Sequence, residues 1–151
     1  MNTTCYQQLD WPQIPEPIII SLLENTKNKI EYLKKINSIA STGYFQVPAT
    51  EELVNWVQQN LPVDNDHVVA VQVFNNVENA KMHKDLTRDI AYNYLLVPHT
   101  ATTRWFDDHV NLIDQVQYQY GFWYKHSADI FHDVIDINGF RAAVTVYPPK
   151  Y

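Results

Sequence analysis

The second half of the chain is a series of short segments rich in β-branched and aromatic residues. Seven of them fall between residues 67 and 148, including VVAVQVF, DIAYNYLL and FRAAVTVY, and each is bounded by Asn, Asp, Pro or Gly. Parallel strands need a crossover connection, usually a helix, and these segments follow one another too closely for that. The spacing therefore predicts an antiparallel barrel or sandwich over residues 67–148.

The first 66 residues have a different pattern, which predicts an arm and two helices. Residues 1–17 contain three prolines and should be extended, and IIISLL after them is a short strand or the approach to a helix. Apolar residues then recur at helical spacing from Thr26 to about Ala40. A second helix is expected in ATEELVNWVQQNLP, with Thr50 as its N-cap and Pro62 after its end.

The whole chain of 151 residues is therefore expected to form a single, mostly β domain with N-terminal helices packed against one sheet. Residues 1–66 would supply the arm and helices, and residues 67–148 the barrel core. One segment, HVNLIDQVQYQY within residues 108–120, is ambiguous, and we interpret it as a long loop crossing the barrel.

Composition argues against several classes of function. The chain has three glycines and lacks the glycine-rich loops that bind phosphate groups. The net charge is −6 with no basic run, which disfavours a nucleic-acid partner. We find no signal peptide and no apolar stretch approaching the ~20 residues of a membrane span, so a cytoplasmic protein without a membrane partner is expected. The single cysteine, Cys5, cannot form an internal disulfide.

Three residues have the right types for a metal site. His83 and Asp85 are two positions apart, so in a strand they project from the same face. His132 lies in a later predicted strand. Two imidazoles and one carboxylate on one side of a divalent metal leave positions open for a cosubstrate and oxygen. Such a metal needs an electron source, which a chelating 2-oxo acid can supply, and Arg141 is suitably placed to bind the far carboxylate of that acid.

This set of residues resembles the iron(II)- and 2-oxoglutarate-dependent oxygenases, in particular their prolyl-hydroxylase-like branch. The resemblance lies in His83-x-Asp85, in the triplet His132-Asp-Val134, and in Arg141, which comes nine residues after His132 and opens the strand RAAVTVY. It implies a double-stranded β-helix, the jelly-roll or cupin type of barrel. It also implies Fe(II) bound by the triad, 2-oxoglutarate as cosubstrate, and hydroxylation by O₂ of an amino acid, a peptidyl residue or a small metabolite.

The resemblance also suggests roles for two tyrosines in RDIAYNYLL. In this family a tyrosine on the strand after H-x-D helps to hold the far carboxylate of the cosubstrate, and the matching residue here is Tyr94. Tyr92, on the same face, would line the pocket near the metal. Asn93 would point the opposite way unless a bulge in the strand exchanges these roles.

Four other residues each allow two interpretations. Arg88 could meet a substrate or cosubstrate carboxylate, although a solvated loop arginine is the more ordinary interpretation. Trp105 and Trp123 could wall the substrate pocket, but large aromatics in strands usually belong to the core. His126, six residues before His132, is the rival for the second imidazole.

Two other classes of function remain open on the sequence. A cupin-like metal-binding module without oxygenase activity would keep His83, Asp85 and His132 but would not need Arg141. A structural or interaction protein on a degenerate barrel would need none of the four. The sequence does not specify the substrate, which can be a small molecule or a peptidyl residue, or the oligomeric state.

Overall fold

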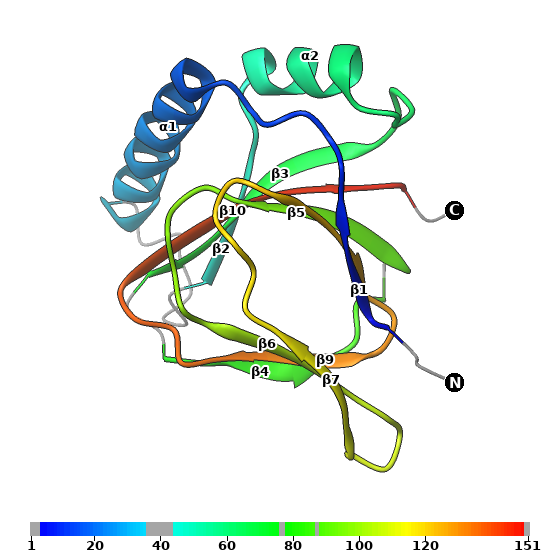
Figure 1. The fold of residues 1–151 in the computed structure, drawn as a ribbon. Coiled ribbons are helices and arrows are strands. Elements are labelled where there is room, and N and C mark those ends of the chain that lie inside the picture. Colours follow the sequence, from blue (N-terminus) through cyan, green and yellow to red (C-terminus); the bar gives the residue numbers. More distant parts are fainter. Residues whose placement is uncertain (1–3, 36–43, 76–77, 87, 150–151) are drawn as a thin grey trace.

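Two antiparallel sheets face each other and make the jelly-roll barrel (Figure 1). The computed structural model describes residues 4–35, 44–75, 78–86 and 88–149. The larger sheet contains, in spatial order, β1 (Tyr6–Leu9), β8 (Trp123–Ser127), β5 (Ile90–Leu95), β10 (Phe140–Tyr147), β3 (Val68–Asn75) and β2 (Tyr44–Pro48). The smaller sheet contains β4 (Ala80–His83), β9 (Phe131–Ile135), β6 (Thr102–Phe106) and β7 (Leu112–Val116). The predicted fold class, mostly β with N-terminal helices, is confirmed.

The two helices, α1 (Glu16–Lys35) and α2 (Glu51–Asn60), cover the outer face of the larger sheet (Figure 1). The predicted cap of α2 is confirmed, because the Thr50 hydroxyl accepts a hydrogen bond from the Leu53 N–H at 3.3 Å. Among the described residues, no helix is both long and apolar enough to cross a membrane.

The start of the first helix differs from the prediction. The helix begins at Glu16, ten residues before Thr26, so that IIISLL lies inside it. The Pro15 carbonyl accepts the N–H groups of Ile18 and Ile19, and Pro17 is tolerated because the first turn of a helix needs no donor there. Its buried residues follow helical spacing from this earlier start: Ile19, Leu22, Thr26 and Ile30. The predicted end near Ala40 lies outside the described residues.

Three strands were not predicted. β1 and β2 come from the N-terminal region and form the two edges of the larger sheet. β7 lies within residues 108–120, where we expected a loop crossing the barrel, and it pairs with β6 at the edge of the smaller sheet. Its side chains are mostly exposed, so the strand lacks the apolar alternation that reveals a buried one.

The main hydrophobic core lies between the larger sheet and the helices. Leu22 of α1 and Leu53 of α2 pack there in one cluster with Trp123 of β8 and with Val144 and Val146 of β10. Successive residues of a strand point to opposite faces, so the alternate residues of β10 point into the barrel. The stabilising core is thus on one side of the larger sheet, which leaves its other face available for polar groups.

Truncating Leu22 should therefore destabilise the protein far more than truncating its neighbour Ile20. The Leu22 side chain is 0% exposed, and Leu22→Ala leaves a cavity that should cost about 2–5 kcal/mol of unfolding free energy. Ile20, on the same helix, is 59% exposed, and Ile20→Ala should cost only about 0.5 kcal/mol. Urea denaturation of both variants measures the difference. Equal losses would contradict the placement of the core.

Candidate functional site

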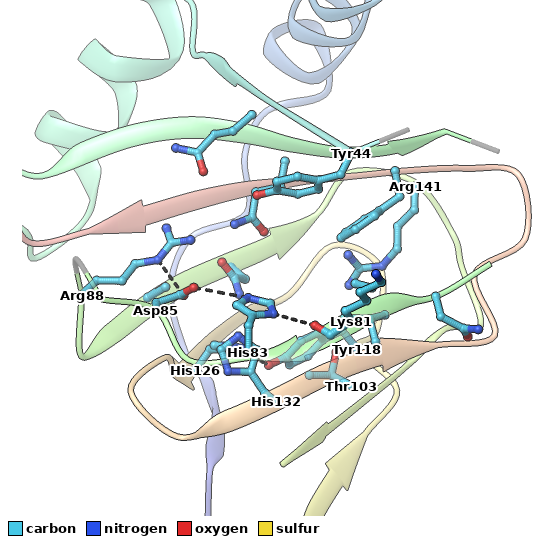
Figure 2. A pocket seen from close by; sticks show the side chains of 18 residues that line it. Tyr44, Lys81, His83, Asp85, Arg88, Thr103, Tyr118, His126, His132 and Arg141 are labelled. Carbon is cyan, nitrogen blue, oxygen red and sulfur yellow. Dashed lines mark hydrogen bonds and ion pairs between the residues drawn. The ribbon is translucent and has the colours of Figure 1, made fainter. Parts of the chain in front are cut away.

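A cavity of about 810 Å³ lies inside the barrel and is lined by residues from both sheets (Figure 2). The three predicted metal ligands and the predicted carboxylate-binding arginine all line it: His83, Asp85, His132 and Arg141. The structure thus places together residues that span 59 positions of the sequence.

The pairing of β4 with β9 brings the two histidines together. His83 and His132 are directly opposite each other in this antiparallel pair, and their ring centroids are 4.4 Å apart. Asp85 lies just beyond the end of β4, where its N–H donates to the Ala128 carbonyl at 2.9 Å. One ligand atom from each of the three side chains lies within 4.8 Å of the other two. This is a compact set of two imidazoles and one carboxylate.

Both imidazoles are oriented by hydrogen bonds that leave Nε2 available. The Nδ1 atom of His83 is 2.8 Å from the Lys81 carbonyl, and that of His132 is 2.7 Å from the Ile130 carbonyl. A carbonyl can only accept, so Nδ1 carries the proton and Nε2 is the atom left to bind a metal. This arrangement is the usual support for histidine ligands of metals.

The carboxylate of Asp85 is oriented in a similar way. Its Oδ2 accepts from the Arg88 Nε at 2.9 Å, and its Oδ1 lies 3.3 Å from the His83 Nε2. Burial raises the pKa of Asp85, but the hydrogen bonds from His83 and Arg88 and the charge of Arg88 outweigh it and hold the pKa well below its usual value. The group is therefore an ionised carboxylate, as metal binding requires.

The pKa values of the two histidines are shifted in opposite directions. Burial lowers the pKa of His132, so this imidazole is neutral near pH 7. The hydrogen bond to Asp85 raises the pKa of His83. A metal binding to Nε2 of His83 would displace the proton held against Asp85. The donor set of one carboxylate and two imidazoles thus fits a divalent transition metal.

Arg141 is a buried cation on β10. It is 6% exposed and its guanidinium lies 5.7 Å from the centre of the Phe74 ring. It forms no ion pair with the part of the chain that the structure describes. Burial lowers its pKa, which is the cost of holding the charge away from water. An anion bound in the cavity would offset that cost.

The prediction for Tyr92 and Tyr94 is wrong. Both point toward the helices: Tyr94 packs 5.0 Å from Trp123, and Tyr92 lies 4.7 Å from Trp11. The pairing of β5 with β8 and β10 runs in regular register, so no bulge exchanges the faces. Asn93 lines the cavity instead. The tyrosines belong to the hydrophobic core, which takes every second residue of the strand.

Tyr118 places a hydroxyl group in the cavity, and the sequence analysis did not predict it. It precedes β8, lines the cavity, and interacts electrostatically with Arg141. Its hydroxyl is 2.6 Å from the Nδ1 atom of His126. Burial raises the pKa of Tyr118 well above its usual value and lowers that of His126, so both groups are neutral. No sequence motif marks Tyr118, because it lies outside any strand.

The remaining candidates are also placed by the structure. Arg88 is buried and paired with Asp85, so its interpretation as a solvated loop residue is wrong. Trp105 and Trp123 are fully buried in hydrophobic clusters, in agreement with the core interpretation. His126 lines the cavity but is not part of the group of three ligand side chains, so it is not the second imidazole.

Comparisons with known proteins show the fold. No family model and no curated protein matches the chain. A prolyl-4-hydroxylase from Pseudomonas putida is similar with a TM-score of 0.59 and 12% identity over 99% of this chain and 89% of that one. A Trichoplax adhaerens prolyl hydroxylase, solved with a hypoxia inducible factor peptide, has a TM-score of 0.62 and 11% identity over 97% of this chain and 84% of that one. AviO1 from Streptomyces viridochromogenes has a TM-score of 0.57 and 12% identity over 99% of this chain and 94% of that one.

These similarities extend over nearly the whole chain. The chain therefore has the prolyl-hydroxylase-like, double-stranded β-helix fold, as the resemblance in sequence implied. A shared fold at 11–12% identity does not transfer an activity, since one fold hosts many functions. Function has to be derived from the residues of the cavity.

If the three side chains form one metal site, His132→Ala should abolish binding of Fe(II) or Mn(II) at micromolar metal, because two ligands remain. Anaerobic titration calorimetry measures the stoichiometry and affinity. His109→Ala, which removes an exposed histidine, is the control and should bind one metal as the wild type does. Unchanged binding in His132→Ala would contradict the site.

Proposed function

We propose that the protein is an Fe(II)- and 2-oxoglutarate-dependent dioxygenase that hydroxylates an amino acid, a peptidyl residue or a small metabolite. The observation that carries the proposal is the combination of two features in one cavity. Three oriented ligand atoms converge at His83, Asp85 and His132, and the buried guanidinium of Arg141 forms no ion pair with the described residues.

The triad residues would hold the iron. Hydrogen bonds to backbone carbonyls orient His83 and His132 so that Nε2 of each can bind the metal, and Arg88 holds Oδ2 of Asp85. The metal would take the place of the proton now shared between Oδ1 of Asp85 and Nε2 of His83. Fe(II) bound there would, together with 2-oxoglutarate, activate O₂ for oxidation of a C–H bond and yield succinate and CO₂.

Arg141 and Tyr118 would bind the far carboxylate of 2-oxoglutarate. A guanidinium binds a carboxylate through two parallel hydrogen bonds, and the Phe74 ring beside it limits access of water. If the Nδ1 of neutral His126 donates to the Tyr118 oxygen, the hydroxyl proton is left for the cosubstrate. Tyr118 would thus take the role first assigned to Tyr94.

The alternative function is a cupin-like metal-binding module without oxygenase activity. Such a module would use the same triad but would gain nothing from a buried cation beside it. The cost of burying Arg141 without an acidic partner in the described chain therefore favours the oxygenase.

Arg141→Ala should weaken 2-oxoglutarate binding and leave metal affinity nearly unchanged. Loss of one partner of a buried charge pair costs about 3–5 kcal/mol, or roughly two to three decades of affinity. Arg141→Lys keeps the charge but loses the two parallel N–H donors of the guanidinium, so its affinity for 2-oxoglutarate should lie between those of the wild type and Arg141→Ala. Calorimetry without O₂ measures the Mn(II) affinity on the metal-free variants and the 2-oxoglutarate affinity on the Mn(II)-loaded variants. Wild-type affinity for 2-oxoglutarate in Arg141→Ala would place the carboxylate elsewhere.

The reaction itself is tested by succinate formation. The Fe(II)-loaded protein should convert 2-oxoglutarate slowly to succinate even without substrate, and only in the presence of O₂. Succinate is measured by mass spectrometry, and His132→Ala, which lacks a triad ligand, is the negative control. A metallated protein that binds 2-oxoglutarate and forms no succinate would favour the binding module.

A further inference from the structure

Arg88 has a hydrogen-bond donor that pairs with nothing in the described part of the chain. The side chain is 9% exposed, its Nε donates to Asp85, and its guanidinium lies 4.2 Å from the centre of the Tyr147 ring. The Nη1 atom is buried and has no hydrogen-bond partner among the described residues. A buried donor without a partner costs free energy, and Arg88 lines the cavity. A ligand in the cavity with an acceptor oxygen would satisfy it.

Arg88 and Arg141 lie on opposite sides of the triad (Figure 2). The register of β10 agrees, because Arg141 and the Tyr147 ring that contacts Arg88 are at opposite ends of that strand. Six residues of strand span roughly 20 Å. With 2-oxoglutarate extending from the metal toward Arg141, Arg88 faces the space on the other side, which is left for the substrate.

Two further polar atoms without partners lie between these ends. Asn93 and Thr145 are direct neighbours across β5 and β10, on the face of the sheet that also carries Arg141. The Asn93 Oδ1 and the Thr145 Oγ1 are both buried with no hydrogen-bond partner among the described residues. Asn93 lines the cavity, so its oxygen can accept a hydrogen bond from a ligand.

Tyr44 places a hydroxyl on the same side of the cavity as Arg88. It comes from β2, lines the cavity, and interacts electrostatically with both Arg88 and Asp85. Figure 2 shows its ring above the triad. Tyr44 is 39% exposed, and partial burial raises its pKa further above neutrality, so the hydroxyl is protonated near pH 7 and can donate.

The charge of the cavity favours a second anion. Its described lining includes three cations, Lys81, Arg88 and Arg141, and one carboxylate, Asp85, although the whole protein has a net charge of −6. A divalent metal adds two positive charges, and 2-oxoglutarate offsets only two. A cavity with this excess of positive charge attracts anionic ligands.

We propose that the substrate is a small carboxylic acid with an N–H or O–H group beside its carboxylate, such as a free amino acid or a 2-hydroxy acid. Its carboxylate binds Arg88 and Tyr44, and its donor binds the Oδ1 of Asn93. A cavity of about 810 Å³ has the size of small-molecule sites, typically about 300–1,000 Å³, and it must also hold 2-oxoglutarate. A residue within a peptide has no free carboxylate for Arg88. This inference rests on the proposed function.

Calorimetry tests it on the Mn(II)-loaded protein saturated with 2-oxoglutarate, with O₂ excluded so that nothing turns over. Each of the twenty L-amino acids, L-lactate and L-malate is titrated, and the best ligand is compared with its carboxamide. At least one acid should bind with a Kd of about 1 mM or below. The carboxamide should bind about tenfold more weakly or worse, because it cannot form the charged pair.

Variants then locate the carboxylate. Arg88→Gln should weaken binding of the best acid by about tenfold or more and leave binding of its carboxamide nearly unchanged. Because Arg88 also holds Asp85, saturation of this variant with Mn(II) and 2-oxoglutarate is verified first. Tyr44→Phe keeps the Arg88–Asp85 pair and removes one hydrogen bond to the ligand, so it should lower the affinity for the acid about three- to tenfold.

Three results would overturn the proposal. They are no binding of any acid although 2-oxoglutarate binds, equal affinity for acid and carboxamide, or unchanged affinity for the acid in Arg88→Gln. A wild-type protein that binds Mn(II) but not 2-oxoglutarate would instead refute the proposed function, and this inference with it.

Discussion

The pairing of β4 with β9 is the interaction on which the site depends. It sets His83 opposite His132, although they are 49 positions apart in the sequence, and the rest of the site is arranged around these two rings. The β4 ladder is short and irregular, so it gains support from the regular pairing of β9 with β6 and from the bond between Asp85 and Ala128. A slip of one residue in β9 would turn His132 out of the cavity.

The two faces of the larger sheet have different roles, one in stability and the other in the candidate site. Its outer face packs against α1 and α2 in the main hydrophobic core, and its inner face carries Arg141, Asn93 and Thr145. Because the main core lies on the outer face, the inner face can hold, beside smaller apolar clusters that include Phe74 and Tyr124, polar atoms that no described residue satisfies. Such atoms are costly when buried, and two of them, Arg88 Nη1 and Asn93 Oδ1, belong to residues that line the cavity, where a ligand can pair with them.

The sequence was most informative where a property is local. The seven strand segments, the Thr50 cap, the triad and the position of Arg141 all follow from spacing or from short motifs. Which face of a strand lies inside is a tertiary property, and this is why Tyr92 and Tyr94 were assigned to the cavity when they belong to the helix-side core. Tyr118 was missed because its position depends on the barrel closing around it.

The central claim is that one cavity binds a metal and 2-oxoglutarate together, and a thermal-shift measurement with Mn(II), 2-oxoglutarate, or both tests it most directly. Mn(II) alone should raise the Tm, and 2-oxoglutarate should raise it further only when the metal is present. A ligand at about one hundred times its Kd adds about 2.7 kcal/mol of stability, which for a chain of this size corresponds to roughly 5–10 °C. A protein whose Tm responds to neither ligand, or to the metal alone, would contradict the claim.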